Sequence, residues 1–256
     1  MNSKKSICST FLKLFVSLLV LIMIMSVTSC SEGIFSHDEN SGTELRTLPA
    51  FSKIQLNSIA DIKLVNDSVF SVKLDGNPAN FMEITTEVIN DTLKIYDHNT
   101  RTWVPDYMRT SLEIHFPDLK KIMLWAPCNL TNADTLRLNN LIIWALGNTT
   151  RTNLTIKMNN FYLVTGSNDF GYYTLNGMAS TTTLWPRGSA IIHAENLNNH
   201  SLKVTSNTIA DTRVYAPGKL SVAITSTGNV LYSGNPSSIE MLDESGKGKL
   251  IDVGRE

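Results

Sequence analysis

The chain has 256 residues, of which 42% are hydrophobic and 18% charged, and its formal net charge is −1. This composition favours a folded protein over a disordered one, with enough chain for one sizeable core or two small ones. The sequence has no basic surplus and no long run of lysine or arginine. Because binding to phosphates requires clustered positive charge, this argues against a nucleic-acid partner.

The first residues have the pattern of a secretory targeting segment. Lysines precede an apolar run from Leu14 to Met25, which only Ser17 interrupts. The run is shorter than the roughly 20 residues that a membrane-spanning helix needs, and it fits the apolar region of a signal peptide. We therefore predict a signal peptide over residues 1–29.

Val27-Thr28-Ser29-Cys30 resembles the lipobox of bacterial lipoproteins. The resemblance implies cleavage before Cys30 and attachment of a diacylglyceryl group to its sulfur, and two or three acyl chains anchor a protein stably. The expected location is the bacterial cell envelope, at the outer membrane, on its periplasmic side or exposed at the surface. An ordinary signal peptide or an uncleaved anchor is the alternative. Residues 30–44 are polar and contain glycine, which predicts a flexible tether.

Residues 45–110 contain short runs in which apolar and polar residues alternate, and this period predicts strands. Turn formers such as Asn66-Asp67, Gly76-Asn77-Pro78 and Asn90-Asp91 separate the runs. No segment carries a 3.6-residue apolar stripe with capping residues, so we expect almost no helix outside the signal peptide. We expect irregular strands here, followed by a loop.

Residues 111–256 contain a degenerate repeat of about twenty residues, the period of a solenoid rung. Each repeat opens with alternating apolar residues and then breaks at a small or polar residue. One rung cannot bury its own apolar face, so neighbouring rungs must stack. We therefore predict an all-β fold, a single-stranded β-helix or β-solenoid, as the domain over residues 45–256. The repeats begin near Leu119, Leu141, Phe161, Thr181, Leu202, Leu220 and Ile239.

Two stretches carry a family resemblance. Leu112–Leu130 has an alternating strand, a proline, the pair Leu-Lys and a second strand, and Leu220–Ile251 has a Tyr-x-Gly-x-Pro element and a glycine-rich turn. Both are similar to the auto-transporter adhesin head-domain family (head GIN domain), and residues 45–64 fit its first strands. The resemblance implies a secreted, lipid-anchored bacterial β-solenoid, and it supplies no catalytic residues. The Gly-Ser-Gly corners of the family are replaced in the middle repeats.

No group of residues has the spacing of a metal or catalytic site. His193 and His200 lie seven residues apart around a predicted turn, and the other histidines are scattered. There is no G-x-S-x-G motif, and no column of carboxylates one repeat apart that a glycan-cleaving β-helix would need. Once the signal peptide is removed and Cys30 acylated, Cys128 is the remaining cysteine, expected in the core. We expect no enzyme activity, no cofactor and no metal.

The repeats between Leu119 and Val164 are apolar on both faces of their strands. If Ile122, Leu141 and Phe161 point inward, their neighbours point outward and form an apolar patch, which needs a cover or a partner. Three interpretations stay open: a cover by residues 45–96 or by the loop around Trp103–Tyr107, a binding face for a glycan or protein, or a different strand register. The candidate binding face comprises Met123, Trp125, Ile142, Trp144, Tyr162 and Trp185.

Three Asp-Ser/Thr-apolar tripeptides resemble the acceptors of a bacterial periplasmic O-glycosylation system. They give Ser68, Thr92 and Thr135 as candidate acceptors, all at predicted turns, where a glycan would be tolerated.

The main functional hypothesis is a non-enzymatic, lipid-anchored envelope protein whose solenoid surface serves adhesion or binding. One alternative is a carbohydrate-binding or carbohydrate-cleaving β-helix that uses the face of Trp125 and Trp144. The other is a structural or assembly protein in which the apolar patch is an oligomer seam.

Overall fold

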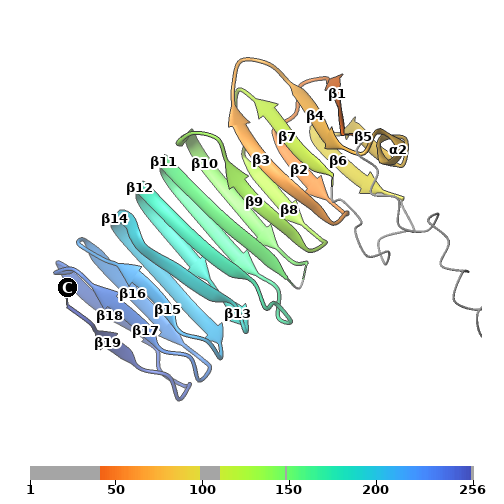
Figure 1. Ribbon diagram of the computed structural model, residues 1–256. Helices are drawn as coiled ribbons and strands as arrows, with labels where there is room; N and C mark the ends of the chain where they lie inside the picture. The colour runs from red at the N-terminus through yellow and green to blue at the C-terminus, as the bar shows by residue number, and fades with distance from the viewer. Residues whose placement is uncertain (1–40, 99–109, 148, 255–256) are drawn as a thin grey trace, which may run out of the picture. The chain divides into compact units, whose positions relative to one another are not determined.

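The computed structural model describes residues 41–98, 110–147 and 149–254, so the signal peptide and Cys30 lie outside the described residues. The described part is a β-solenoid of about seven turns (Figure 1). Within it the helical segment is α2 (Pro78–Phe81), one turn with the Asn77 side chain accepting a hydrogen bond from the Ala79 N–H. The all-β prediction and the near absence of helix are confirmed.

The strands, in chain order, are β1 (Gly42–Thr47), β2 (Lys53–Leu56), β3 (Ala60–Asn66), β4 (Ser71–Gly76), β5 (Ile84–Ile89), β6 (Thr92–Asp97), β7 (Ser111–Phe116), β8 (Lys121–Leu124), β9 (Cys128–Asn132), β10 (Leu136–Ala145), β11 (Thr150–Thr165), β12 (Tyr172–Trp185), β13 (Arg187–Gly188), β14 (Ile191–Thr208), β15 (Thr212–Tyr215), β16 (Lys219–Ile224), β17 (Val230–Ser233), β18 (Ser238–Asp243) and β19 (Leu250–Asp252).

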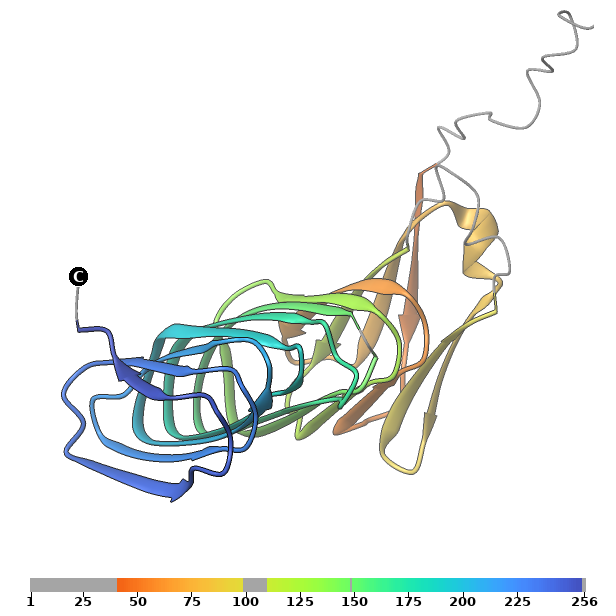
Figure 2. The ribbon, with the colours of Figure 1, turned by 90° about the horizontal axis from the view of Figure 1, so that it is seen from below.

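Each turn of the solenoid contributes to two sheet faces, and successive turns pair in parallel (Figure 2). Face A is built from β3, β9, the first halves of β10, β11, β12 and β14, and then β15, β17 and β19. Face B is built from β2, β8, the second halves of β10, β11, β12 and β14, and then β16 and β18.

The long strands β10 and β11 turn from face A to face B at paired asparagines. The amide of Asn159 donates to the side-chain oxygen of Asn139 at 2.6 Å, and Asn160 donates to Asn140 at the same distance. These side chains are exposed, and none of the four asparagines has a left-handed backbone conformation. The corner is therefore held by a ladder of amides that links one turn to the next.

The core lies between the two faces and is built as columns of stacked apolar residues. On face B one column is fully buried and runs in strict register through six turns. Each residue in it buries its side chain against the same position one turn away, which is how a single rung gains stability from its neighbours. The column is formed by Ile122, Ile143, Leu163, Leu184, Val204 and Val222.

The solenoid begins before the repeats that the sequence shows. β2 and β3 pair in parallel register with β8 and β9, so residues 53–66 form a turn of the same solenoid. The chain then leaves it through β4, α2 and β5, and β6 and β7 return in parallel beside β2 and β3. This excursion hides the period in the sequence, which is why residues 45–110 are predicted only as irregular strands.

The two ends of the stack differ. At the N-terminal end, β4 pairs antiparallel with β7 and β1 with β4, while β5 pairs antiparallel with β6. At the other end β18 and β19 have strand partners on one side only among the described residues. Ile239, in register with the buried Leu220, is therefore 45% exposed.

Candidate functional site

The outer side of face B carries an aromatic row. Met123, Trp144, Val164 and Trp185 stand in register on β8, β10, β11 and β12. Trp144 is 36% exposed and Trp185 39% exposed. Val164 points outward between them, yet it is only 8% exposed, because the larger side chains on either side of it cover it. The row is thus a continuous apolar ridge across four turns.

A second outward row runs beside the first. Lys121, Ile142, Tyr162 and Thr183 stand in register, with Ile142 39% exposed and Tyr162 partly buried. Burial raises the pKa of the Tyr162 phenol. Trp125, one residue past β8, is 50% exposed.

The predicted strand register is confirmed. Side chains predicted to point inward, such as Ile122, are buried, and side chains predicted to point outward, such as Ile142 and Trp144, are exposed. Among the described residues, the segment 45–96 leaves the tryptophans of this face accessible. The loop around Trp103–Tyr107 lies outside the described residues. We call the six predicted residues the outer aromatic face: Met123, Trp125, Ile142, Trp144, Tyr162 and Trp185.

Cations lie against both tryptophans of the row, which the sequence reasoning missed. The ammonium of Lys121 lies 3.0 Å from the centroid of the Trp144 ring, and the guanidinium carbon of Arg187 lies 5.6 Å from that of Trp185. Both distances suit a cation–π interaction. Burial, with the neighbouring charge of Lys53, lowers the pKa of Lys121. The signal in the sequence was a lysine one repeat before Trp144.

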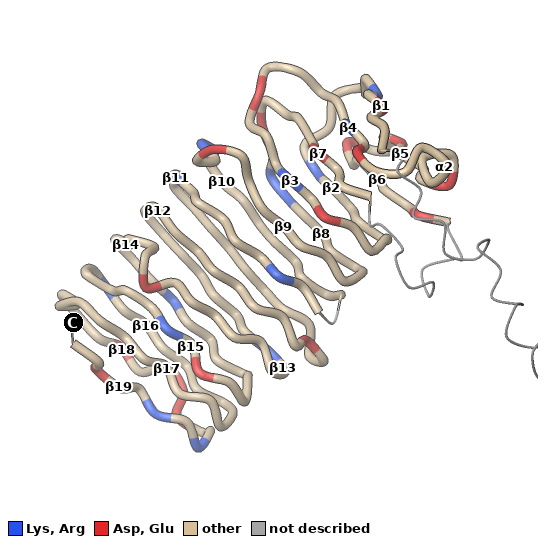
Figure 3. Tube along the Cα trace, viewed as in Figure 1, with Lys and Arg blue, Asp and Glu red and all other residues tan. Residues whose placement is uncertain are grey.

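The charged residues around the outer aromatic face are mostly basic. β8, β10, β11 and β12 contain no acidic residue, and the middle turns show few charges at all (Figure 3). Lys53 pairs at 3.8 Å with Asp91 at the edge of the region, where both side chains are exposed. The outer aromatic face is therefore apolar with a positive border. Basic residues on the outer side of face B include Lys53, Lys94, Lys121, Lys203 and Lys219, and Arg187 of β13 lies against Trp185.

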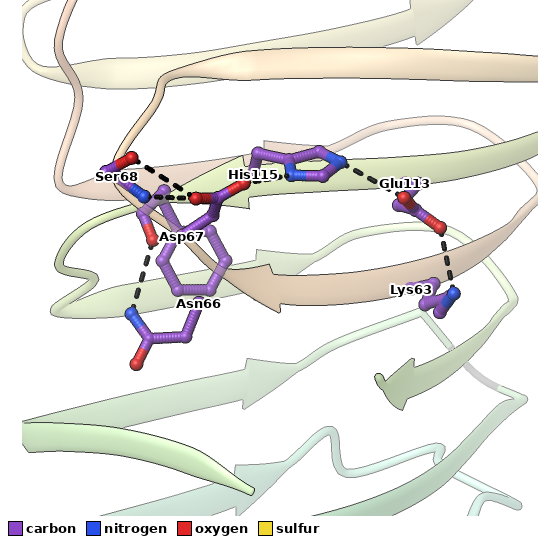
Figure 4. Close-up of polar contacts among 7 residues, drawn as sticks. Lys63, Asn66, Asp67, Ser68, Glu113 and His115 are labelled. Atoms are coloured by element: carbon purple, nitrogen blue, oxygen red, sulfur yellow. Dashed lines mark hydrogen bonds and ion pairs between the residues drawn. The ribbon is translucent and has the colours of Figure 1, made fainter. Parts of the chain in front are cut away.

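Ser68, one candidate glycan acceptor, belongs to a polar cluster on β3 and β7 (Figure 4). Its N–H donates to Asp67 at 2.5 Å, and His115 lies 3.2 Å from Asp67 and 3.1 Å from Glu113. Glu113 also pairs with Lys63 at 2.9 Å. The Ser68 N–H, together with His115, lowers the pKa of Asp67, and Lys63 lowers that of Glu113. The cluster is a surface ion-pair network that fixes the turn holding Ser68.

The three candidate acceptors differ in access. Ser68 is exposed and Thr135 partly exposed, whereas Thr92 is only 9% exposed and its hydroxyl donates to the Asn90 carbonyl. The folded chain thus offers Ser68 and Thr135 more readily than Thr92. Modification at these positions stays a prediction.

Metal-ligating and nucleophilic groups are dispersed in the described ranges. No group of three or more His, Cys, Asp or Glu side chains there could hold a metal ion. Cys128 is buried, and burial raises the pKa of its thiol to about 12, so the thiol stays protonated and unreactive. Within the same described residues, no helix has the length and apolar character to cross a membrane.

Comparison with solved structures reveals the same fold in bacterial proteins. A putative adhesin from Bacteroides fragilis is 18% identical, with a TM-score of 0.77 over 84% of this chain and 98% of that one. A putative adhesin from Parabacteroides distasonis is 14% identical (TM-score 0.59, 83% and 98% covered). A protein from the same species, described as a putative lipid binding protein, is 15% identical (TM-score 0.54, 84% and 98% covered).

A search of curated proteins found no match. The family described as "Putative auto-transporter adhesin, head GIN domain" matches residues 50–236, which include β2 and β3 and most of the solenoid. The chain therefore belongs to the head GIN domain family of β-solenoids.

Proposed function

We propose that this chain is a non-enzymatic, lipid-anchored envelope protein that uses the outer aromatic face to bind a protein partner in adhesion. The partner would present apolar groups flanked by acidic ones. The observation that carries the proposal is the exposed ridge of Trp144 and Trp185 with Lys121 and Arg187 against the rings. Membership of an adhesin-like family supports an envelope or surface role.

The cations on the rings favour a protein over a stacked sugar. A sugar ring that stacked on the Trp144 face occupied by Lys121 would have to displace the ammonium. An acidic side chain of a protein could instead pair with Lys121 or Arg187 while apolar groups packed on the exposed tryptophan surface. Tryptophan and arginine are the residues that most often dominate protein interfaces, and opposite charges steer the encounter.

The same face supports binding rather than cleavage. Glycoside hydrolysis needs two carboxyl groups within a few ångströms of the scissile bond. The four strands β8, β10, β11 and β12 supply none. For this face the carbohydrate-cleaving alternative therefore has no acid–base pair to use.

Replacing Trp144 with alanine should weaken binding to an acidic extracellular protein about tenfold or more, because a central aromatic anchor is lost. Fibronectin and laminin are suitable probes, with lysozyme as a basic protein that the cationic border should repel. Binding of the full-length protein would be measured by biolayer interferometry, with Leu45→Ala as the control, since Leu45 is 67% exposed on β1, which pairs with β4 and not with a strand of face B. Lys121→Glu should slow association.

Equal binding by wild type and Trp144→Ala would count against the outer aromatic face. A wild-type dimer that becomes monomeric in Trp144→Ala, seen by sedimentation velocity, would instead identify the face as an oligomer seam. Absence of binding to all acidic probes would also contradict the proposal.

Replacing Cys30 with alanine should move the protein from the membrane fraction to the soluble fraction, because the acceptor of the lipid is removed. The measurement is cell fractionation with immunoblotting, and metabolic labelling with a fatty acid should disappear in the variant. Cys128→Ala is the matched control, since that thiol is buried. Unchanged fractionation of Cys30→Ala would refute the lipid anchor.

A further inference from the structure

The last turns of face A carry a polar groove made of three adjoining hollows. The largest, about 650 Å³, is lined by residues that include Glu195, Asn198, Arg213 and Tyr215. A second hollow of about 270 Å³ shares Tyr215 and Gly254 with it. A third, of about 260 Å³, shares Asn198 with the first. The hollows share lining residues, and we call the polar surface that they form the Tyr215 groove.

The acceptor groups of this groove are held in place by their neighbours. The carboxylate of Glu195 lies 2.9 Å from Nδ1 of His193, whose ring stacks on Tyr172 with centroids 5.0 Å apart. At the other end, the Asp252 carboxylate accepts a hydrogen bond from the Gly254 N–H at 2.9 Å. Both carboxylates are thus oriented before any ligand arrives, which lowers the entropy cost of binding.

Hydrogen-bond donors line the same hollows. Arg213 is exposed and has no ion pair with any described residue. Asn196 and Asn198, which lie in the same hollow, and Asn235, in the adjoining one, add amides that donate and accept. The ring of Tyr215 is partly buried at the junction of the hollows, where it offers an apolar surface.

We propose that the Tyr215 groove binds a short neutral oligosaccharide. Sugar hydroxyls both donate and accept, so they can satisfy carboxylates, amides and a guanidinium along one wall. An aromatic side chain can pack against the apolar face of a sugar ring. An anionic chain would meet Glu195 and Asp252 at close range, and like charges would oppose it. The groove lies on face A, so this inference is independent of the protein-binding face on face B.

The test uses the full-length protein and four defined probes: maltotriose, cellotriose, mannotriose and chitotriose. Binding would be followed by saturation-transfer NMR and isothermal titration calorimetry. We expect at least one trisaccharide to bind, and Arg213→Ala or Tyr215→Ala to weaken it about tenfold or more, since each change removes a contact to the ligand. Tyr215→Phe keeps the ring and should retain most of the affinity, which separates loss of contact from misfolding.

Two controls locate the site. Arg151→Ala removes an exposed arginine of face A several turns away and should leave sugar binding unchanged. Trp144→Ala should also leave it unchanged, so failure of the protein-binding proposal and failure of this one are distinguishable. The inference is overturned if none of the four trisaccharides binds, or if binding survives Arg213→Ala and Tyr215→Ala. Trigalacturonate is the anionic comparison, and its preferential binding over the four neutral trisaccharides would also overturn the inference.

Discussion

Replacing Gly177 with alanine should lower the free energy of unfolding by about 3 kcal/mol or more. Gly177 lies on β12 with φ of +103°, a conformation that residues with a Cβ rarely adopt. A Cβ at this position would overlap the carbonyl oxygen of Ile156 on the turn below, with which Gly177 is in register. Alanine at this position therefore destabilises the fold in two ways: its backbone is strained, and its Cβ overlaps a backbone atom that the parallel pairing holds in place.

Gly254→Ala is the matched control for this prediction. Gly254 also has positive φ, +68°, but a Cβ there would have no heavy atom within 4 Å. Gly254→Ala should lower the free energy of unfolding by only about 1 kcal/mol, the penalty of the left-handed conformation alone. Urea denaturation followed by circular dichroism would measure both. Similar midpoints for the two variants would show that the close approach of the turns at Gly177 is not a tight constraint.

Acidification from pH 7 to pH 5 should stabilise the wild-type protein relative to Asp169→Asn by roughly 1–2 kcal/mol. Asp169 is 1% exposed, and burial raises the pKa of its carboxyl to about 6. The folded state then binds a proton more tightly than the unfolded chain, whose aspartate titrates near 3.8. The stabilisation that protonated Asp169 contributes is therefore fully present below about pH 4 and is lost as the pH rises through 6.

The hydrogen bonds around Asp169 make the asparagine variant a fair comparison. The carboxylate accepts from the Tyr173 hydroxyl at 2.6 Å and from the Gly171 N–H at 2.9 Å. Asparagine keeps an oxygen for Gly171 and can donate to the Tyr173 hydroxyl. The asparagine side chain does not titrate, so the difference in unfolding free energy between wild type and Asp169→Asn at each pH reports the protonation of Asp169. Surface acids whose pKa is lowered, such as Asp67 and Glu113, are present in both proteins and cancel in this difference.

Thermal or urea denaturation at several pH values would make the measurement. Tyr173→Phe supplies a second variant, because it removes one donor to the buried carboxylate and should destabilise more at pH 7 than at pH 5. A stability difference between wild type and Asp169→Asn that is flat from pH 5 to pH 7 would contradict the raised pKa.

The fold could be predicted because inward apolar residues recur at alternate positions in most of the repeats. Ile122, Leu141 and Phe161 point inward as the period requires, and they are almost completely buried. The outer aromatic face followed from the same alternation. The first turn could not be found this way, since the excursion between β3 and β7 separates strands that pair in register. Periodicity measured along the chain cannot detect a turn whose neighbour is some fifty residues away.

Side-chain contacts between turns also could not be predicted from the sequence. Lys121 reaches Trp144 from one turn away, and a strand pattern says nothing about where a long side chain leans. The Tyr215 groove assembles residues from Met178 to Gly254, and no motif in the sequence marks them. Such sites depend on register and on corner geometry, which single-sequence patterns leave undetermined.

The spacing of the solenoid turns fixes the distances within the outward row of Met123, Trp144, Val164 and Trp185. Neighbouring strands of a sheet lie about 4.8 Å apart, so Trp144 and Trp185, two strands apart in register, are separated by about 10 Å along the stack. Because each turn contacts only its neighbours, evolution can insert or delete a whole turn without changing the others. A change of one turn between the tryptophans would preserve folding yet alter that spacing by about 5 Å. Turn number alone would then set the distance between the two tryptophans.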